Sequence, residues 1–166
     1  MTKDTWIGDV RAGKYDGKEV ELKGWIHRSR GSNKIRFVVL RDSTGTVQCV
    51  IKRDSVGDEI FDAMKDALIE SSVIICGLVQ PTDREHGHEV QVSSATVVGP
   101  VNPERPFPIT ESAMAEADGG ETEFLLDNRH LYLRTGRMTT MLKLRSTVFG
   151  AIHQYFRDRD FIEYQA

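Results

Sequence analysis

The sequence predicts a mainly β domain of five strands, with one helix between the third and fourth strands, followed by a helical C-terminal part. Residues 20–51 contain three short alternating segments separated by turn residues. Residues 54–71 have helical spacing, and residues 72–98 contain two more strand-like segments. Beyond Gly99-Pro100 the strand pattern stops, and prolines, an acidic stretch and a long helical repeat follow.

The first strand has an apolar face and a charged face. Residues 6–12, just before it, predict one or two helical turns. Val20, Leu22 and Ile26 share the apolar face, because side chains two residues apart point the same way. Gly24 interrupts this strand, and it predicts a bulge or a sharp bend, which a small closed barrel requires.

Two turns separate the next strands. A Gly-Ser-Asn turn at 31–33 leads into a strand at 35–40, and an Asp-Ser-Thr-Gly turn at 42–45 leads into a strand at 46–51. The helix predicted over 54–71 carries one apolar stripe: Ile60, Phe61, Met64, Leu68 and Ile69.

The last two strands are predicted at 72–79 and 89–98. Three consecutive strands, a helix and two further strands are the order of the OB-fold, a five-stranded Greek-key barrel whose strand 2–3 face binds oligonucleotides. Another small β-barrel would give the same pattern of elements. The charges and the aromatic residue described next favour the OB-fold, because they lie where that fold binds its ligand.

The charge is unevenly distributed along the chain. The net charge is −3, so any affinity for nucleic acid must come from a local patch. Residues 14–53 contain ten Lys and Arg against four acids, whereas residues 54–70 contain six acids against Lys65 alone. This contrast predicts a basic face and an acidic face that does not touch RNA. A solvated surface of no special function is the simpler alternative.

The basic segment also contains an aromatic ring and an amide. Arg28, Arg30, Lys34 and Arg36 lie close together with no acid among them, and Phe37 follows directly. Gln48 and Lys52 lie on the next strand. Cations hold phosphates, an aromatic ring stacks on an unpaired base, and an amide reads a base edge. The segment therefore predicts a site for single-stranded RNA.

Other site chemistry finds little support. Cys49 and Cys76 have no CxxC spacing, so buried reduced thiols are expected rather than a zinc site. The pair His86 and His88 lacks a third ligand, which favours a loop. No apolar run is long enough to span a membrane and the N-terminus has no secretory apolar region, so a cytosolic protein is expected.

The region after residue 100 differs from the barrel. Pro103, Pro106 and Pro108 mark a boundary, and residues 110–127 are acidic. Apolar residues then recur at helical spacing from Met138 to Phe156. This stripe has nothing local to bury against, so it predicts a partner surface, either another domain or a second subunit.

Residues 24–48 contain, in order, Gly24-Trp25-Ile26-x-Arg28-x-Arg30, Phe37 and Leu40-Arg41-Asp42-x-x-Gly45-x-Val47-Gln48. Together these residues resemble the N-terminal anticodon-binding domain of one family, the class IIb aminoacyl-tRNA synthetases. Residues 125–134 resemble the hinge, and residues 142–163 resemble the start of motif 1, which forms the dimer interface in this family. The resemblance implies an anticodon-binding domain at 1–103, a hinge at 104–135 and a truncated catalytic domain at 136–166.

The resemblance also implies roles for single residues. Phe37 matches the ring that stacks on the central uridine of the anticodon, Gln48 the amide that reads it, and Arg30 an arginine near the anticodon. Arg30 shares the even register of the apolar face, so a bulge or the strand end must turn it outward. Arg28, Lys34, Arg36 and Lys52 are expected only to attract phosphates.

Gln91 separates the two most similar branches of the family. Aspartyl members carry a glutamate at this strand-5 position, where a carboxylate accepts from the cytosine amine of the third anticodon base. An amide both donates and accepts, which suits uracil. Gln91 and the segment at 124–134 therefore favour the asparaginyl branch over the aspartyl one.

The ATP-binding motifs 2 and 3 of the family are absent from these residues, and no phosphate-binding GxxxxGK[ST] motif replaces them. The chain is therefore expected to hold no cofactor and to be inactive alone. The resemblance implies a homodimeric parent enzyme that ligates asparagine to tRNA with ATP and Mg²⁺. A free-standing OB-fold RNA-binding module and a structural dimerisation module are the remaining alternatives, but neither accounts for both the helix and the pair of Phe37 and Gln48.

Overall fold

The computed structural model describes residues 5–83, 87–109 and 122–164. The chain forms two compact units, residues 1–108 and residues 109–166. His86 and most of the acidic stretch, including the glycine pair at 119–120, lie outside the described residues. Within the described part, no helix is long and apolar enough to cross a membrane.

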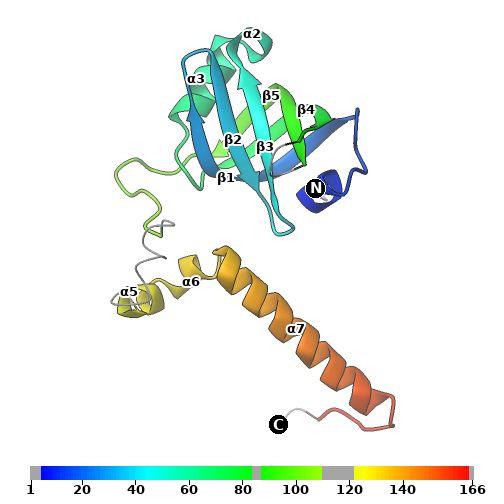
Figure 1. The fold of residues 1–166 in the computed structure, drawn as a ribbon. Helices are drawn as coiled ribbons and strands as arrows, with labels where there is room; N and C mark the ends of the chain where they lie inside the picture. Colours follow the sequence, from blue (N-terminus) through cyan, green and yellow to red (C-terminus); the bar gives the residue numbers. More distant parts are fainter. Residues whose placement is uncertain (1–4, 84–86, 110–121, 165–166) are drawn as a thin grey trace. The chain divides into compact units, whose positions relative to one another are not determined.

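The first unit is a closed β-barrel (Figure 1). Its strands are β1 (Glu19–Gly31), β2 (Ile35–Arg41), β3 (Thr46–Lys52), β4 (Ser72–Pro81) and β5 (His88–Gly99). They are hydrogen-bonded in the order β1-β2-β3-β5-β4, and β4 closes the barrel against β1. Every pair is antiparallel except β3 with β5. The predicted five-stranded OB-fold is confirmed.

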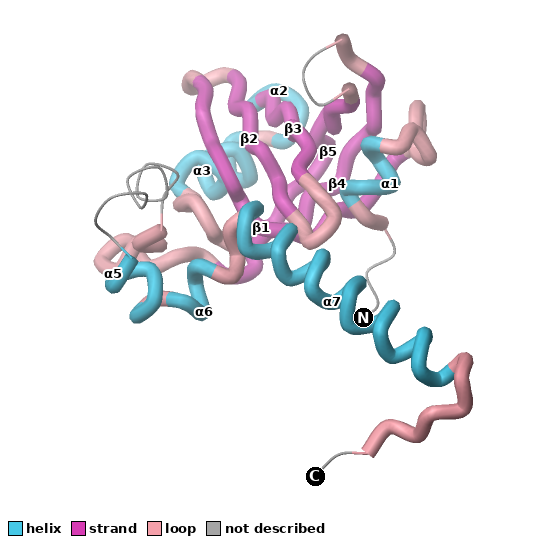
Figure 2. Tube along the Cα trace, turned by 60° about the horizontal axis from the view of Figure 1, so that its bottom comes forward, coloured by secondary structure: helices cyan, strands magenta, loops and turns pink. Residues whose placement is uncertain are grey.

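The core fills the barrel and extends to helices outside it. Inward side chains of the strands are fully buried, among them Leu22, Leu40, Val47, Ile75 and Val90. Figure 2 shows the strands surrounding this interior, with two helices, α2 (Arg53–Val56) and α3 (Asp58–Asp66), next to the sheet. From α3, Phe61 and Met64 are buried in the same core.

The single helix predicted over 54–71 is instead two short helices. Gly57 joins them with a positive φ of 83°, which glycine adopts at little cost, so the helix is interrupted there. The second helix already ends at Asp66. Leu68 and Ile69 follow outside the helix and are exposed, Ile69 to 50%, so they are not part of the buried stripe.

The bulge predicted in β1 lies after Gly24 rather than at it. The pairing with β2 shifts between Ile26 and Arg28, so His27 is the extra residue. Before the bulge Ile26 points into the core. After it Ser29 pairs with the buried Val38, so the arginines on either side of Ser29 face outward. Gly24 has another function: a Cβ there would collide with the carbonyl of Arg41 on β2.

Asp42 connects the β2–β3 turn to the first helix, α1 (Ile7–Arg11). Its Oδ1 accepts hydrogen bonds from Thr44 N at 2.7 Å, Thr44 Oγ1 at 2.6 Å and Gly45 N at 3.1 Å. Its Oδ2 accepts from Ile7 N at 3.0 Å, in the first turn of α1. Since the Ile7 side chain is fully buried in the core, this carboxylate fixes both the turn and the predicted N-terminal helix.

The second unit consists of helices. Its described elements are α5 (Thr122–Asp127), α6 (Arg129–Tyr132) and α7 (Gly136–Arg157). Thr135 caps α7 by accepting a hydrogen bond from Met138 N at 3.4 Å. The predicted C-terminal helix is thus confirmed, and residues 161–164 after it belong to no helix or strand.

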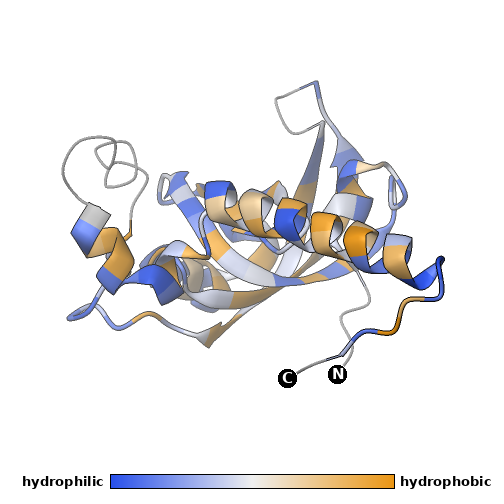
Figure 3. Cartoon of the chain, turned by 90° about the horizontal axis from the view of Figure 1, so that it is seen from below, coloured by the Kyte–Doolittle hydropathy of each residue, from blue (hydrophilic) through white to orange (hydrophobic). Residues whose placement is uncertain are grey.

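The apolar stripe of α7 remains exposed. Figure 3 shows orange, apolar residues along this helix. The exposed ones are Met141, Leu142, Leu144, Val148, Phe149, Ile152, Tyr155 and Phe156. An exposed apolar surface of this kind marks a site of association with another protein surface.

Replacing Asp42 tests the link between the turn and α1. Asp42→Ala removes four hydrogen bonds to a buried carboxylate, and we expect the free energy of unfolding to fall by about 2–3 kcal/mol. Urea unfolding followed by tryptophan fluorescence measures this, because Trp6 and Trp25, the only tryptophans of the chain, both lie in the barrel unit. Asp83→Ala, at an exposed turn, is the control. A loss below about 0.5 kcal/mol for Asp42→Ala, the usual effect of a surface change, would contradict this role.

Candidate nucleic-acid interface

Four adjacent strands present two rows of side chains on the outer face of the barrel. The strand register aligns, from β1 through β2 and β3 to β5, a first row of Arg28, Val39, Gln48 and Glu89. It aligns a second row of Arg30, Phe37, Val50 and Gln91. Residues two apart on a strand face the same side, so the rows are neighbours. The structure therefore brings together five of the sequence-predicted residues.

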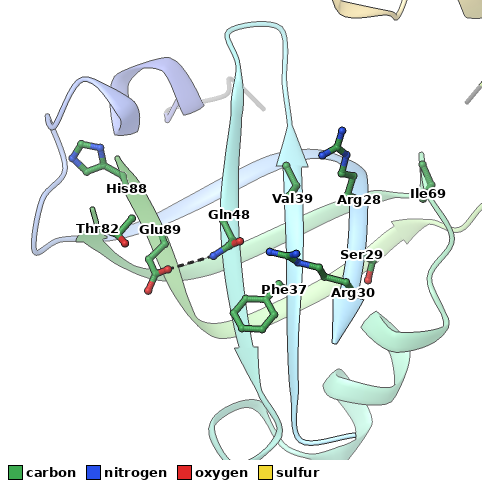
Figure 4. A pocket seen from close by; sticks show the side chains of 10 residues that line it. All are labelled: Arg28, Ser29, Arg30, Phe37, Val39, Gln48, Ile69, Thr82, His88 and Glu89. Atoms are coloured by element: carbon green, nitrogen blue, oxygen red, sulfur yellow. Dashed lines mark hydrogen bonds between the residues drawn. The ribbon is translucent and has the colours of Figure 1, made fainter. Parts of the chain in front are cut away.

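A cleft of about 460 Å³ lies over the first row and over Arg30 and Phe37 of the second row, whereas Val50 and Gln91 do not line it (Figure 4). Arg28, Arg30, Phe37 and Gln48 line it from β1, β2 and β3. Ile69 lines it from the segment before β4, and Thr82, His88 and Glu89 line it from the end of β4 and the start of β5. The cleft thus combines cations, a phenyl ring, an imidazole, an amide and a carboxylate.

Phe37 lies on the outer face and not in the core. Its side chain is half-buried, whereas its strand neighbour Val38 is fully buried. The guanidinium of Arg30 lies 5.8 Å from the centroid of the Phe37 ring, within the range of a cation–π contact. The two residues form a pair that offers a flat apolar surface next to a positive charge.

Gln48 and Gln91 meet at a residue that the sequence did not single out, Glu89. Gln91 Nε2 donates to Glu89 Oε1 at 2.8 Å, and Gln48 Nε2 donates to Glu89 Oε2 at 3.4 Å. Figure 4 shows Gln48 between Glu89 on one side and Val39 on the other. The sequence did contain a signal for Glu89: it lies two residues before Gln91, and that spacing places both on one face of a strand.

The remaining predicted cations lie apart from the two rows. Lys34 is exposed in the β1–β2 turn, and Lys52 is exposed at the end of β3. Arg36 occupies the inward register of β2, where it pairs with Gly31 and donates from Nη2 to Ser29 Oγ at 3.0 Å. Its Nε is buried without a hydrogen-bond partner among the described residues. Arg36 therefore does not line the cleft.

Arg53, which directly precedes the acidic segment 54–70, forms ion pairs with that segment. Arg53 contacts Asp58 and Asp62, each at 2.6 Å. These hydrogen bonds raise the pKa of Arg53 above its usual value, and the one with Arg53 lowers the pKa of Asp62. The guanidinium also lies 4.2 Å from the centroid of the Phe61 ring. Arg53 is thus engaged with α3 rather than with the cleft.

Two further groups bear on what the site can do. His88 lines the cleft, with Nε2 3.0 Å from Asp16 Oδ1. Complete burial raises the pKa of the Cys49 thiol to about 12, so the thiol stays protonated at neutral pH. Among the residues that the structure describes, no three His, Cys, Asp or Glu side chains are grouped so that they could hold a metal ion.

Comparison with known proteins agrees with this geometry. Residues 20–98 match the family model of the OB-fold nucleic acid binding domain. The asparagine–tRNA ligase of Symbiobacterium thermophilum is 37% identical over 158 residues, which are 95% of this chain and 34% of the relative. The asparagine–tRNA ligase of Thermoplasma acidophilum is 37% identical over 160 residues, or 96% and 35% of the two chains.

Solved structures give the same result. The asparaginyl-tRNA synthetase of Pyrococcus horikoshii complexed with asparaginyl-adenylate superposes with a TM-score of 0.87 at 33% identity, covering 99% of this chain and 36% of that one. The aspartyl tRNA synthetase of Entamoeba histolytica shares the fold at 20% identity, with a TM-score of 0.79 over 98% and 38% of the chains. The barrel therefore has the OB-fold, and its residues 20–98 are similar to a nucleic acid binding domain. Over nearly its whole length the chain is similar to asparagine–tRNA ligases, about a third of whose length it spans.

Proposed function

We propose that this chain is the tRNA-binding part of an asparaginyl-tRNA synthetase and that the outer-face cleft binds the anticodon loop. The observation that carries the proposal is the juxtaposition of Arg30, Phe37 and Gln48 on one face of the barrel. A cation, a ring and an amide are the three elements that recognition of an unpaired base requires. The similarity to an asparagine–tRNA ligase supports an asparagine tRNA as the RNA that this cleft binds.

Each residue has a separate task in this proposal. Phe37 stacks on the central base of the anticodon. Arg30 contacts the Phe37 ring and binds the adjacent phosphate. Gln48, next to the ring on β3, reads the edge of that base. Arg28, Lys34 and Lys52 add positive charge that attracts the backbone at a distance.

The parent protein would ligate asparagine to its tRNA through an aminoacyl-adenylate in the cytoplasm. ATP and Mg²⁺ would act in its catalytic domain rather than at the cleft. The exposed apolar side chains of α7 support a homodimeric parent, because a second copy would cover them.

An aspartyl enzyme is the second candidate, and Glu89 is the observation that favours it. Its carboxylate lines the cleft and could accept from the amino group of cytosine, the third base of aspartate anticodons. Against this, Glu89 already accepts from Gln91 and Gln48. The two relatives at 37% identity are also asparagine–tRNA ligases.

Removing the Phe37 ring tests the stacking. Phe37→Ala should weaken binding of an asparagine anticodon stem-loop by about 1–3 kcal/mol, since that is the worth of one base–aromatic stack. Fluorescence anisotropy at fixed salt measures the affinity. The matched control is Phe149→Ala, which removes an exposed ring from α7 and should leave RNA binding unchanged.

Thermal unfolding of the same variant separates stacking from packing. The midpoint of Phe37→Ala should stay close to that of the wild type, because the ring is only half-buried. A loss of about 3–5 kcal/mol in stability would instead identify a core residue and contradict the assignment.

Exchanging the amide of Gln91 tests the choice of third base. Gln91→Glu should shift preference from a GUU toward a GUC anticodon loop by about tenfold, because a carboxylate accepts from cytosine but faces O4 of uracil with repulsion. Both loops are compared at one salt concentration, since the phosphate contribution is common to them.

Gln154→Glu on α7 is the charge-matched control for Gln91→Glu and should leave the preference unchanged. If the wild type already prefers GUC, the aspartyl candidate replaces the asparaginyl one. If neither protein distinguishes the loops, Gln91 does not read the third base.

A further inference from the structure

We propose that Glu89 is the positioning residue of the cleft: its carboxylate holds the amides of Gln48 and Gln91 in one orientation and thereby sets which bases they accept. This inference rests on the proposed function, because it assigns a cause to the base selectivity of the same site. It adds a residue that contacts both reading amides.

The two hydrogen bonds define the arrangement. One oxygen of Glu89 accepts from Gln91 Nε2 at 2.8 Å, and the other accepts from Gln48 Nε2 at 3.4 Å. An ionised carboxylate only accepts, whereas an amide has one end that donates and one that accepts. With Nε2 of each glutamine turned toward Glu89, the reverse orientation would place an amide oxygen against a carboxylate oxygen. Glu89 therefore disfavours the flipped form of both side chains.

The backbone holds Glu89 in place for this purpose. The short parallel ladder between β3 and β5 pairs Gln48 with Glu89 and Val50 with Gln91. Between them, Cys49 pairs with Val90, and both are fully buried in the core. The three side chains thus start from neighbouring points on a rigid part of the barrel, so their mutual orientation is set before any RNA binds. Preorganisation of this kind lowers the entropy cost of binding.

The fixed orientation leaves a defined pattern for a base. An amide nitrogen has two N–H groups, so each glutamine keeps one donor and its oxygen acceptor after bonding to Glu89. The Watson–Crick edge of uracil offers O4 as an acceptor and N3–H as a donor, which matches this pair. A freely rotating amide could also present its groups in the reverse order, which suits the amino group and N3 of cytosine. Locking the amide therefore favours uracil.

The two bonds differ in strength. The bond from Gln91 is short and charge-assisted, whereas the bond from Gln48 is long, so Gln91 is held more firmly. Loss of Glu89 should therefore relax selectivity most at the base that Gln91 reads.

Glu89 should also weaken RNA binding of any sequence, and this effect can be measured separately from its effect on base selectivity. A carboxylate in a cleft for a polyanion repels phosphates, an effect that Arg28 and Arg30 on the same face oppose. Replacing Glu89 by glutamine should therefore act in two directions. Affinity for RNA of any sequence should stay equal or rise, while discrimination between bases should fall. A residue that only contributes charge would change all affinities by one factor.

The test compares wild-type and Glu89→Gln chains of 166 residues. Stem-loops with U or C at the third anticodon position and one with an all-adenine anticodon are titrated at one salt concentration. We expect the U-over-C preference to fall about tenfold in Glu89→Gln, with the all-adenine loop bound as well as before or better. Glu59→Gln, which removes an exposed charge from α3, is the matched control and should keep the preference.

A second readout needs no RNA. In NMR spectra the side-chain NH₂ signals of Gln48 and Gln91 should shift in Glu89→Gln, whereas that of Gln154 on α7 should not. Unchanged NH₂ signals of both Gln48 and Gln91 would overturn the positioning role whatever the RNA does. A wild type that discriminates and a Glu89→Gln variant that discriminates equally would overturn it too. A wild type that binds no anticodon loop would refute the proposed function instead, and the NH₂ signals alone would then decide the positioning role.

Discussion

The bulge at His27 in β1 is the constraint on which the functional surface depends. A strand with a strict period of two keeps every even-numbered residue on one face, and on β1 that face is the core side up to Ile26. The single extra residue reverses the order, so Arg28 and Arg30 pair with Val39 and Phe37 outside the barrel. Without the bulge two guanidinium groups would point into the core. The extra residue His27 therefore allows β1 both to close the barrel and to supply Arg28 and Arg30 to the cleft.

Two carboxylates, Asp42 and Glu89, connect separate segments of the barrel unit by hydrogen bonds. Asp42 joins the β2–β3 turn to α1, and Glu89 joins the amides of Gln48 and Gln91. Each acts because a carboxylate accepts several hydrogen bonds at once and donates none. The barrel is thus preorganised at two points by groups that are not themselves part of the apolar core.

The sequence predicted the elements well and their pairing less well. Alternation and turn residues located all five strands, because these signals are local. The bulge at His27 and the inward side of Arg36 depend on register between strands, which local pattern does not specify. The break at Gly57 depends on a positive φ, which glycine permits but does not impose. For the site, residue type and resemblance predicted Phe37 and Gln48, and the structure places both on the cleft. Glu89 was missed because an acid was not expected beside a basic patch, and its contacts with both amides appear only when β3 and β5 lie side by side.

The location of the anticodon site is the central claim, and chemical-shift mapping tests it most directly. Titrating the ¹⁵N-labelled chain with an asparagine anticodon stem-loop should shift backbone amides of residues 28–30, 37–39, 48 and 89–91 the most. Amides around the apolar groove lined by Trp6 and Trp25 should shift little, although that groove is also exposed. The largest shifts at this groove or on the acidic helix α3, with the cleft unaffected, would contradict the account.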